Sequence, residues 1–162
     1  MKLIYFNADY VVNIHDKILH ISGGIFGVKN IGNIDSPLNH IQNDDYYPTF
    51  EEKLTHLVFC LNKFHGFNDG NKRASIGIGA FFLEVNGLDI IVNKFIIEME
   101  NIAVLVADNI IDKDLLHEII HSLVNEIDYS EELKLKIINA LLQLKEEDIP
   151  NVEGPEFYRD LW

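Results

Sequence analysis

The chain has 162 residues, of which 48% are hydrophobic, and its formal net charge is −13 at pH 7. This length is sufficient for one domain with a buried core, and the composition is typical of a soluble globular protein. The acidic balance disfavours a nucleic-acid-binding protein, because contacts with phosphates need clustered Lys and Arg. An anionic ligand would instead be attracted to the locally basic window that contains Lys63, Lys72 and Arg73.

The sequence shows no recognisable targeting or membrane segment. Residues 1–9 become acidic before an apolar core of signal-peptide length has formed. No stretch reaches the roughly 18 uncharged apolar residues that a membrane span requires. We therefore expect a cytoplasmic protein that does not interact with membranes. The single cysteine, Cys60, cannot form an internal disulfide, and its apolar neighbours predict a buried, unreactive thiol.

The first half of the chain predicts two helices that are separated by a long loop. Apolar residues recur at helical spacing over residues 11–21, and a loop rich in Gly and Asn follows over residues 23–33. Thr49 and Glu52 have the spacing of a capping box. We therefore expect the second helix to begin after Thr49 and to continue to near His65.

The second half of the chain predicts the remaining helices of a bundle. Residues 74–85 are apolar nearly all round, which is typical of a helix at the centre of a bundle. Residues 94–107 are similarly apolar, so we expect these two helices to pack together. Aspartates and a serine suited to N-capping predict further helices over residues 112–126 and 130–147. The tail, residues 150–162, carries acidic and aromatic side chains and either docks on the body or binds a partner.

Residues 65–73, with the sequence His-Gly-Phe-Asn-Asp-Gly-Asn-Lys-Arg, predict a function more narrowly than any other segment. Gly70 precedes the central helix, so the backbone N–H groups of Gly70, Asn71 and Lys72 would lie at a helix N-terminus. Such unpaired amides, together with the helix dipole, favour the binding of an anion. Lys72 and Arg73 would add charged contacts with phosphate oxygens.

Two further side chains of this segment suggest a metal and a base. Asp69 is placed to hold Mg²⁺, which binds to proteins through one or two carboxylates together with substrate phosphates. His65 would face the same pocket, where an imidazole can take a proton from an attacking hydroxyl near neutral pH. Each residue type is ordinary in a polar turn. Their combination between two buried helices favours phosphate binding and hydroxyl activation over a simple turn.

The pattern His65-x-Phe67-x-Asp69-Gly70-Asn71-Lys72-Arg73 resembles the signature loop of the Fic/Doc family, in its death-on-curing (Doc-like) version. The resemblance covers about residues 9–126. Other family-like segments are Ile14-His15-Asp16, Gly23-Gly24-x-x-Gly27, Glu52-Lys53-x-x-His56-Leu57 and Phe82-Leu83-x-x-Asn86-Gly87.

For the fold, this resemblance implies an all-α, Fic-type helical bundle whose central helix follows the signature loop. The Fic/Doc domain would cover residues 1–128. Residues 129–162 would form a C-terminal helix and a tail that pack on this domain or extend it. The resemblance also allows a small β-hairpin flap near Tyr46-Tyr47-Pro48, which would position a target chain.

For the function, the resemblance implies a Doc-like toxin that transfers a phosphoryl group from ATP, with Mg²⁺, to a hydroxyl of a protein. The target would be a translation factor, elongation factor Tu being the family's example, and a small antitoxin protein would be a partner. Within the resemblance, His65 is the base and Asp69 the metal ligand. The phosphates would be held by Gly70, Asn71, Lys72 and Arg73.

Adenylyl transfer (AMPylation) is the nearest alternative. The adenylyl-transferring branch of the family has glycine where this chain has Lys72, and a second arginine where it has Ile76. Both differences resemble the phosphoryl-transferring members. A non-catalytic, Fic-like partner-binding module is a further alternative, but the base, the metal ligand and the cations are all present in the sequence.

A zinc hydrolase is the alternative from another class. His117-Glu118-Ile119-Ile120-His121 matches the H-E-x-x-H pattern, in which two histidines bind zinc and the glutamate acts as the base. Both histidines fall on the polar side of the predicted helix, however, and no residue is marked as a third ligand. These features count against a zinc site.

Overall fold

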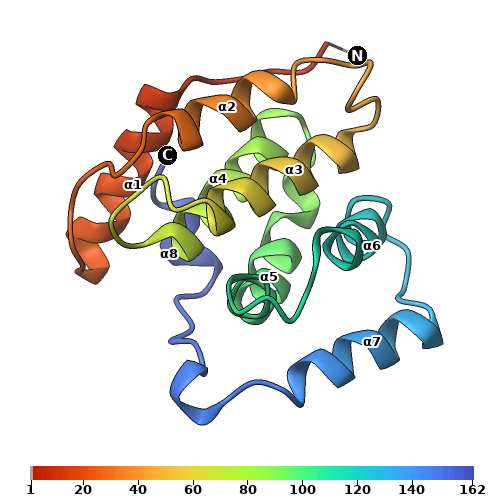
Figure 1. Cartoon of the computed structure of the whole chain (residues 1–162). Helices are drawn as coiled ribbons and strands as arrows, with labels where there is room; N and C mark the ends of the chain where they lie inside the picture. The colour runs from red at the N-terminus through yellow and green to blue at the C-terminus, as the bar shows by residue number, and fades with distance from the viewer. Residues whose placement is uncertain (1) are drawn as a thin grey trace.

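The computed structural model describes residues 2–162, so Met1, the first residue of the predicted Fic/Doc domain, lies outside it. Within this range the chain forms eight α-helices, two short 3₁₀ segments and no β-strand, which confirms the all-α class (Figure 1). The elements are α1 (Ala8–Ser22), α2 (Gly32–His40), α3 (Phe50–Lys63), α4 (Asn71–Val85), η1 (Asp89–Ile91), α5 (Val92–Ala107), α6 (Lys113–Val124), α7 (Glu131–Leu141), η2 (Glu146–Asp148) and α8 (Pro155–Arg159). Among these helices, none combines the length and the apolar character that crossing a membrane requires.

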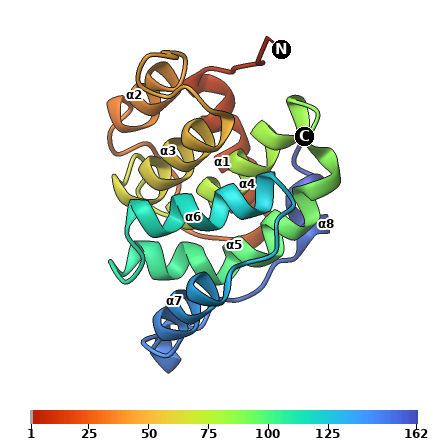
Figure 2. The same ribbon diagram turned by 90° about the vertical axis from the view of Figure 1, so that its right-hand side faces the viewer.

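Helix α4 is the centre of the bundle, as the sequence predicts. It contacts α1, α3, α5 and α8, and Figure 2 shows it enclosed by these helices. Gly79 shows how closely they approach. A Cβ atom at this position would lie 2.8 Å from Phe95 Cζ on α5 and 2.8 Å from Val58 Cγ2 on α3. This close packing explains a glycine inside a helix, where it costs about 1 kcal/mol relative to alanine.

The predicted N-caps are present at the starts of α3 and α6. The N–H of Glu52 donates to Thr49 Oγ1 at 3.2 Å, and the N–H of Thr49 donates to Glu52 Oε2 at 3.0 Å, which completes the capping box. Asp112 caps α6 by accepting a hydrogen bond from the N–H of Leu115 at 2.8 Å. Local side-chain chemistry thus sets these two helix starts.

The C-terminal ends of two helices differ from the prediction. Helix α7 ends at Leu141 and not near Glu147, and η2 follows as a separate turn. Continuation would place acidic residues at the negative end of the helix dipole, which is unfavourable. Helix α6 ends at Val124, where the His121 carbonyl accepts from both the backbone N–H and the side-chain amide of Asn125, at 3.1 and 2.9 Å.

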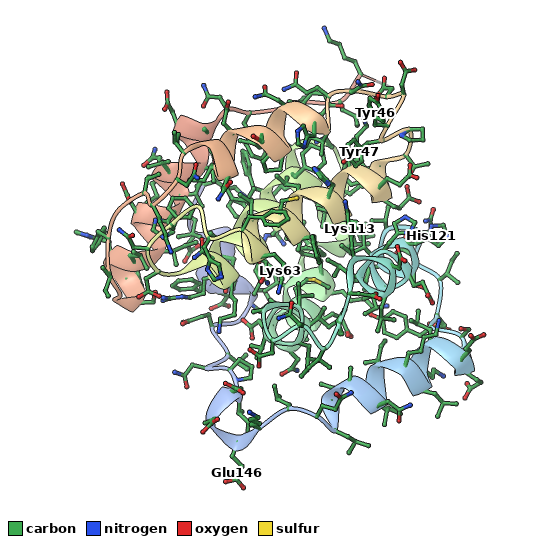
Figure 3. The ribbon with its side chains drawn as sticks, viewed as in Figure 1. Tyr46, Tyr47, Lys63, Lys113, His121 and Glu146 are labelled. Atoms are coloured by element: carbon green, nitrogen blue, oxygen red, sulfur yellow. The ribbon has the colours of Figure 1, made fainter. Side chains whose placement is uncertain are left out.

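The β-hairpin flap expected near Tyr46-Tyr47-Pro48 is not formed. Residues 41–47 make successive turns in which the N–H groups of Tyr46 and Tyr47 both donate to the Asn43 carbonyl. The buried Lys53 ties this segment to α3, because its Nζ donates to Ile41 O and Asp44 Oδ1, each at 2.6 Å. The side chain of Tyr47 lies toward α3, and that of Tyr46 lies farther out (Figure 3).

The C-terminal tail docks on the body of the protein. Helix α8 packs against α4 and α5, where the side chains of Tyr158 and Leu161 are almost completely buried. The carboxylate of Glu100, on α5, accepts hydrogen bonds from the N–H groups of Glu153 and Gly154 at 3.0 and 2.8 Å. We propose on this basis that residues 129–162 extend the domain formed by residues 1–128.

Candidate active site

The segment that joins α3 to α4 places a helix N-terminus at a cavity. Gly70 is the N-cap of α4 and has a left-handed backbone with φ of 76°, which glycine adopts without strain. Among residues 2–162, no side chain caps the start of α4 with a hydrogen bond. The amides of Asn71 and Lys72 therefore stay available for an anion, as the sequence predicts. The N–H of Gly70 is already used, because it donates to Asp69 Oδ1 at 2.7 Å.

The cavity has a volume of about 550 Å³, which is suitable for a small-molecule ligand. The predicted phosphate-binding residues and Asp69 line one side of it. Ser22, Gly23 and Gly24, at the end of α1, line a second side, and Ile76 with Ala103 and Val104 provides apolar surface. The remaining wall consists of Glu100, Tyr158 and residues of the tail between 147 and 153.

The two adjacent cations of this cavity have different environments. Lys72 is exposed and forms no ion pair within residues 2–162. Arg73 is half-buried, and its Nη1 donates to Ser22 Oγ and to the Gly23 carbonyl, the latter at 3.4 Å. Arg73 is thus held against the end of α1, where unpaired carbonyls favour a positive charge. Lys72 is the more adaptable of the two cations.

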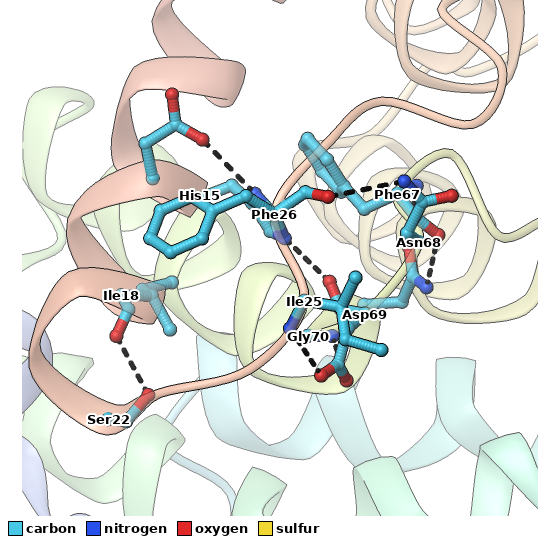
Figure 4. Close-up of polar contacts among 11 residues, drawn as sticks. His15, Ile18, Ser22, Ile25, Phe26, Phe67, Asn68, Asp69 and Gly70 are labelled. Atoms are coloured by element: carbon cyan, nitrogen blue, oxygen red, sulfur yellow. Dashed lines mark hydrogen bonds and ion pairs between the residues drawn. The ribbon is translucent and has the colours of Figure 1, made fainter.

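Asp69 is oriented by backbone amides on both of its carboxylate oxygens. Oδ2 accepts from the N–H of Ile25 at 3.0 Å, and Oδ1 accepts from the N–H of Gly70 (Figure 4). The hydrogen bond from Ile25, supported by that from Gly70 and by the charge of Arg73, lowers the pKa of Asp69 although partial burial opposes this change. The carboxylate is therefore ionised at neutral pH, with a fixed orientation.

This carboxylate fits a magnesium site that the ligand itself completes. Within residues 2–162, no three His, Cys, Asp or Glu side chains are grouped so that they could hold a metal ion. Asp69 would thus be a single protein ligand, and each of its oxygens keeps a free lone pair. Mg²⁺ is commonly bound in this way, through one or two carboxylates together with phosphate oxygens and water.

His65 does not line the cavity, in contrast to what we expected from the sequence. Its side chain is exposed, and its backbone has φ of 49°, a left-handed conformation that is uncommon for a residue other than glycine. Such conformations cost of order 1–3 kcal/mol and are concentrated at functional sites. The structure therefore brings Asp69, Asn71, Lys72 and Arg73 together around the cavity and leaves His65 on the solvent side of the loop.

The loop between α1 and α2 pairs with the signature segment, which the sequence did not indicate. The N–H groups of Lys29 and Asn30 donate to the Gly66 carbonyl at 2.8 and 3.1 Å, and the N–H of Asn68 donates to Gly27 O at 3.0 Å. An isolated β-bridge joins Val28 to Phe67. This pairing holds the first part of the signature segment against the loop between α1 and α2.

Two residues of the H-E-x-x-H pattern, Glu118 and His121, make contacts between helices. Glu118 pairs with Lys136 of α7, at 3.0 Å between Oε1 and Nζ. His121 Nδ1 lies 3.4 Å from Glu51 Oε1 on α3. The rings of His117 and His121 are 6.2 Å apart between their centroids. Both groups that the zinc hypothesis needs as a base and a ligand are thus engaged in contacts between helices.

Comparison with known proteins adds an independent observation to this geometry. A sequence model of the Fic/DOC family matches residues 5–83, a range that contains the whole signature segment and most of α4. Residues 5–83 of the chain are thus similar to the Fic/DOC family, in agreement with the resemblance of the signature segment. A protein named "Protein kinase doc", from Escherichia phage P1, is 26% identical over 90 residues, which are 53% of this chain and 71% of that protein. A comparison with solved structures gave no match.

The residues that line the cavity lie partly inside and partly outside the range that matches the Fic/DOC family. The matched range ends within α4, so the cations and Asp69 fall inside it, whereas Glu100 and the tail fall outside. The cavity therefore combines a part inside the matched range, which carries the predicted phosphate-binding groups, with a wall that is made by the C-terminal half of this chain.

Proposed function

We propose that this protein is a Doc-like enzyme that transfers the terminal phosphoryl group of ATP, with Mg²⁺, to a hydroxyl of a protein. The observation that carries this proposal is the open N-terminus of α4, where free amides, Lys72, Arg73 and an oriented Asp69 line one cavity. A nucleotide triphosphate has the charge and the metal that such a constellation would bind. The name of the phage P1 relative agrees with a kinase activity.

In the proposed reaction, each group of the site has a separate role. The amides of Asn71 and Lys72 and the two cations hold the phosphates, and Asp69 holds Mg²⁺, which would neutralise charge on the phosphate oxygens. The hydroxyl oxygen of the target attacks the terminal phosphorus, and the bond from this phosphorus to the bridging oxygen of ADP, the leaving group, breaks. The hydroxyl proton passes to His65, whose exposed position suits a protein substrate that approaches from solvent.

The preference for phosphoryl over adenylyl transfer rests on Lys72 and Ile76. Ile76 is buried and lines the cavity at the position where the adenylyl-transferring branch has an arginine. The cavity therefore lacks that cation and has Lys72 in place of a glycine. The translation-factor target, the antitoxin partner and the cytoplasmic location stay predictions from the family resemblance.

Labelled ATP tests the proposal directly. The protein is incubated with Mg²⁺, a cell lysate and ATP that carries the label on either the α- or the γ-phosphate. We expect label on protein from γ-labelled ATP alone, and label from the α-phosphate would show adenylyl transfer instead. His65→Ala should abolish transfer, whereas His20→Ala, which alters an exposed histidine on α1, should retain it. Transfer by His65→Ala would refute the assigned base.

A further inference from the structure

His15 lies beneath the signature segment although it belongs to α1. Its side chain is completely buried, and its ring stacks on that of Phe67, with 3.6 Å between the centroids and 5° between the planes (Figure 4). Its Nε2 lies 2.6 Å from the backbone carbonyl oxygen of Asp69. Both of these contacts are made with the segment that carries the cavity's metal ligand and helix N-terminus.

The hydrogen bond to Asp69 defines the state of the imidazole. A carbonyl oxygen only accepts hydrogen bonds, so Nε2 of His15 must carry the hydrogen and donate it. Nδ1 is buried without a hydrogen-bond partner and lies 3.6 Å from the exposed carboxylate of Asp16. Within residues 2–162, the one hydrogen bond of the His15 ring is therefore directed at the backbone of the site.

This interaction fixes one end of a peptide group whose other end is fixed as well. The carbonyl of Asp69 and the N–H of Gly70 belong to the same planar unit. The carbonyl accepts from His15, and the N–H donates to Asp69 Oδ1 at 2.7 Å. The space around Gly70 is also restricted, since a Cβ atom there would lie 3.0 Å from Leu19 Cδ2 and 3.2 Å from His15 Nε2.

We propose that His15 is a positioning residue of the active site. By holding the Asp69–Gly70 peptide in one orientation, it directs the carboxylate of Asp69 and the first free amides of α4 toward the phosphates of the ligand. This inference rests on the proposed nucleotide-dependent function. It assigns to the buried histidine of α1 a role that differs from simple core packing.

Two substitutions distinguish the effect of the hydrogen-bond donor of His15 from the effect of its aromatic ring. His15→Phe keeps an aromatic ring that can stack on Phe67 but removes the donor, which leaves the Asp69 carbonyl buried and unpaired. His15→Gln removes the ring but supplies an amide N–H of similar reach. His20→Ala, on the exposed side of the same helix, is the control. Each folded protein is titrated with ATP in the presence of Mg²⁺, and backbone amide resonances are recorded without ligand.

We expect His15→Phe to bind ATP about tenfold more weakly, which corresponds to the loss of one hydrogen bond that orients the site. The amide resonances of Gly70, Asn71 and Lys72 should shift in this variant and should return toward their wild-type positions in His15→Gln. In the transfer assay, the effect should appear mainly in the KM for ATP. His20→Ala should match the wild type in every measurement.

Two results would overturn the inference. One is unchanged ATP affinity in His15→Phe, and the other is unchanged Gly70 and Asn71 resonances in that variant, because a purely structural histidine would lower only the thermal stability. If the wild-type protein binds no ATP, the proposed function fails. The amide resonances then decide alone whether His15 orients the Asp69–Gly70 peptide.

Discussion

At the scale of single residues, His56 has an unusual environment at the junction of α2, α3 and α6. Lys113 Nζ lies 2.8 Å from His56 Nδ1, and His40 Nδ1 lies 3.1 Å from His56 Nε2. The hydroxyl of Tyr47 is 3.1 Å from Nδ1, and Figure 3 labels Tyr47 and Lys113 beside α3. Because an ammonium group only donates, Nδ1 must act as an acceptor. His56 is therefore neutral in this arrangement.

This environment predicts a pH dependence of stability. Burial, with the charge of Lys113 and the proximity of His40, lowers the pKa of His56 from 6.5 to about 4. Between these values the unfolded chain binds the additional proton, so the free energy of unfolding should fall as the pH decreases, by up to about 3 kcal/mol. Urea unfolding of His56→Gln should show a shallower loss between pH 6.5 and 4. Equal slopes for the wild type and this variant would contradict the assignment.

Other residue-scale features could be predicted only in part from the sequence. The thiol of Cys60 is buried, as predicted, and burial raises its pKa to about 11. The composition of residues 65–73 indicated the residues that line the cavity at the N-terminus of α4, because these residues are neighbours in the chain. It could not show that His65 is exposed and does not line the cavity, since this depends on the backbone conformation of the loop, which is left-handed at His65. The contact between His15 and Asp69 joins residues 54 positions apart and has no local signal.

At the scale of elements, the end of α1 is built around the carboxylate of Asp69. Gly24 has φ of 129°, and a Cβ atom at this position would lie 2.7 Å from Asp69 Oδ2. Gly23 also has a positive φ, of 79°, but a Cβ atom there would meet no atom within 4 Å. The two glycines therefore form a matched pair in which only one is next to the proposed metal ligand.

This pair gives a prediction about the magnesium site. Gly24→Ala should displace the Asp69 carboxylate and weaken the binding of ATP with Mg²⁺ by about tenfold, an effect of about 1.4 kcal/mol. Gly23→Ala should strain the backbone and lower the melting temperature but bind ATP nearly as the wild type does. Calorimetric titration and thermal unfolding of both variants provide the measurements. Equal losses of affinity would show that the contact with Asp69 is not responsible.

The helices themselves were the most predictable part of the fold. Apolar periodicity and capping residues indicated α1, α3, α4 and α5, because both signals are local in the sequence. The ends of α6 and α7 were less predictable, since side chains and dipole effects at the last turn decide them. The prediction of a β-hairpin flap was wrong. Lys53 and local turns form hydrogen bonds with backbone groups of residues 41–47, so these groups do not need strand pairing.

At the scale of the whole molecule, the tail completes both the core and the cavity. Tyr158 is 1% exposed and packs between α4 and α5, although it lies outside the range that the family model matches. Tyr158→Ala should lower the free energy of unfolding by about 3 kcal/mol, as is typical when a large buried aromatic is removed. Leu142→Ala is the control, because Leu142 is 78% exposed. A loss below about 0.5 kcal/mol for Tyr158→Ala, the size expected at the surface, would contradict docking of the tail.

The tail also brings negative charge to the cavity. Glu147, Asp148 and Glu153 line it together with Lys72 and Arg73, and carboxylates should repel an anionic nucleotide. Replacing the three acids by their amides should tighten ATP binding by about threefold at low salt. The difference should diminish near 0.5 M salt, where the screening length is only about 4 Å. Equal affinities of this variant and the wild type at low salt would show that the tail does not affect the ligand electrostatically.

The central claim is that a nucleotide triphosphate binds at the N-terminus of α4, and calorimetric titration with ATP and Mg²⁺ tests it most directly. The wild-type protein should show saturable binding at one site. Lys72→Ala should bind about tenfold more weakly, because a charge-assisted contact with phosphate is lost. Lys94→Ala, at an exposed lysine on α5, should bind as the wild type does. Absence of binding to the wild type, or equal affinities of the two lysine variants, would contradict the account.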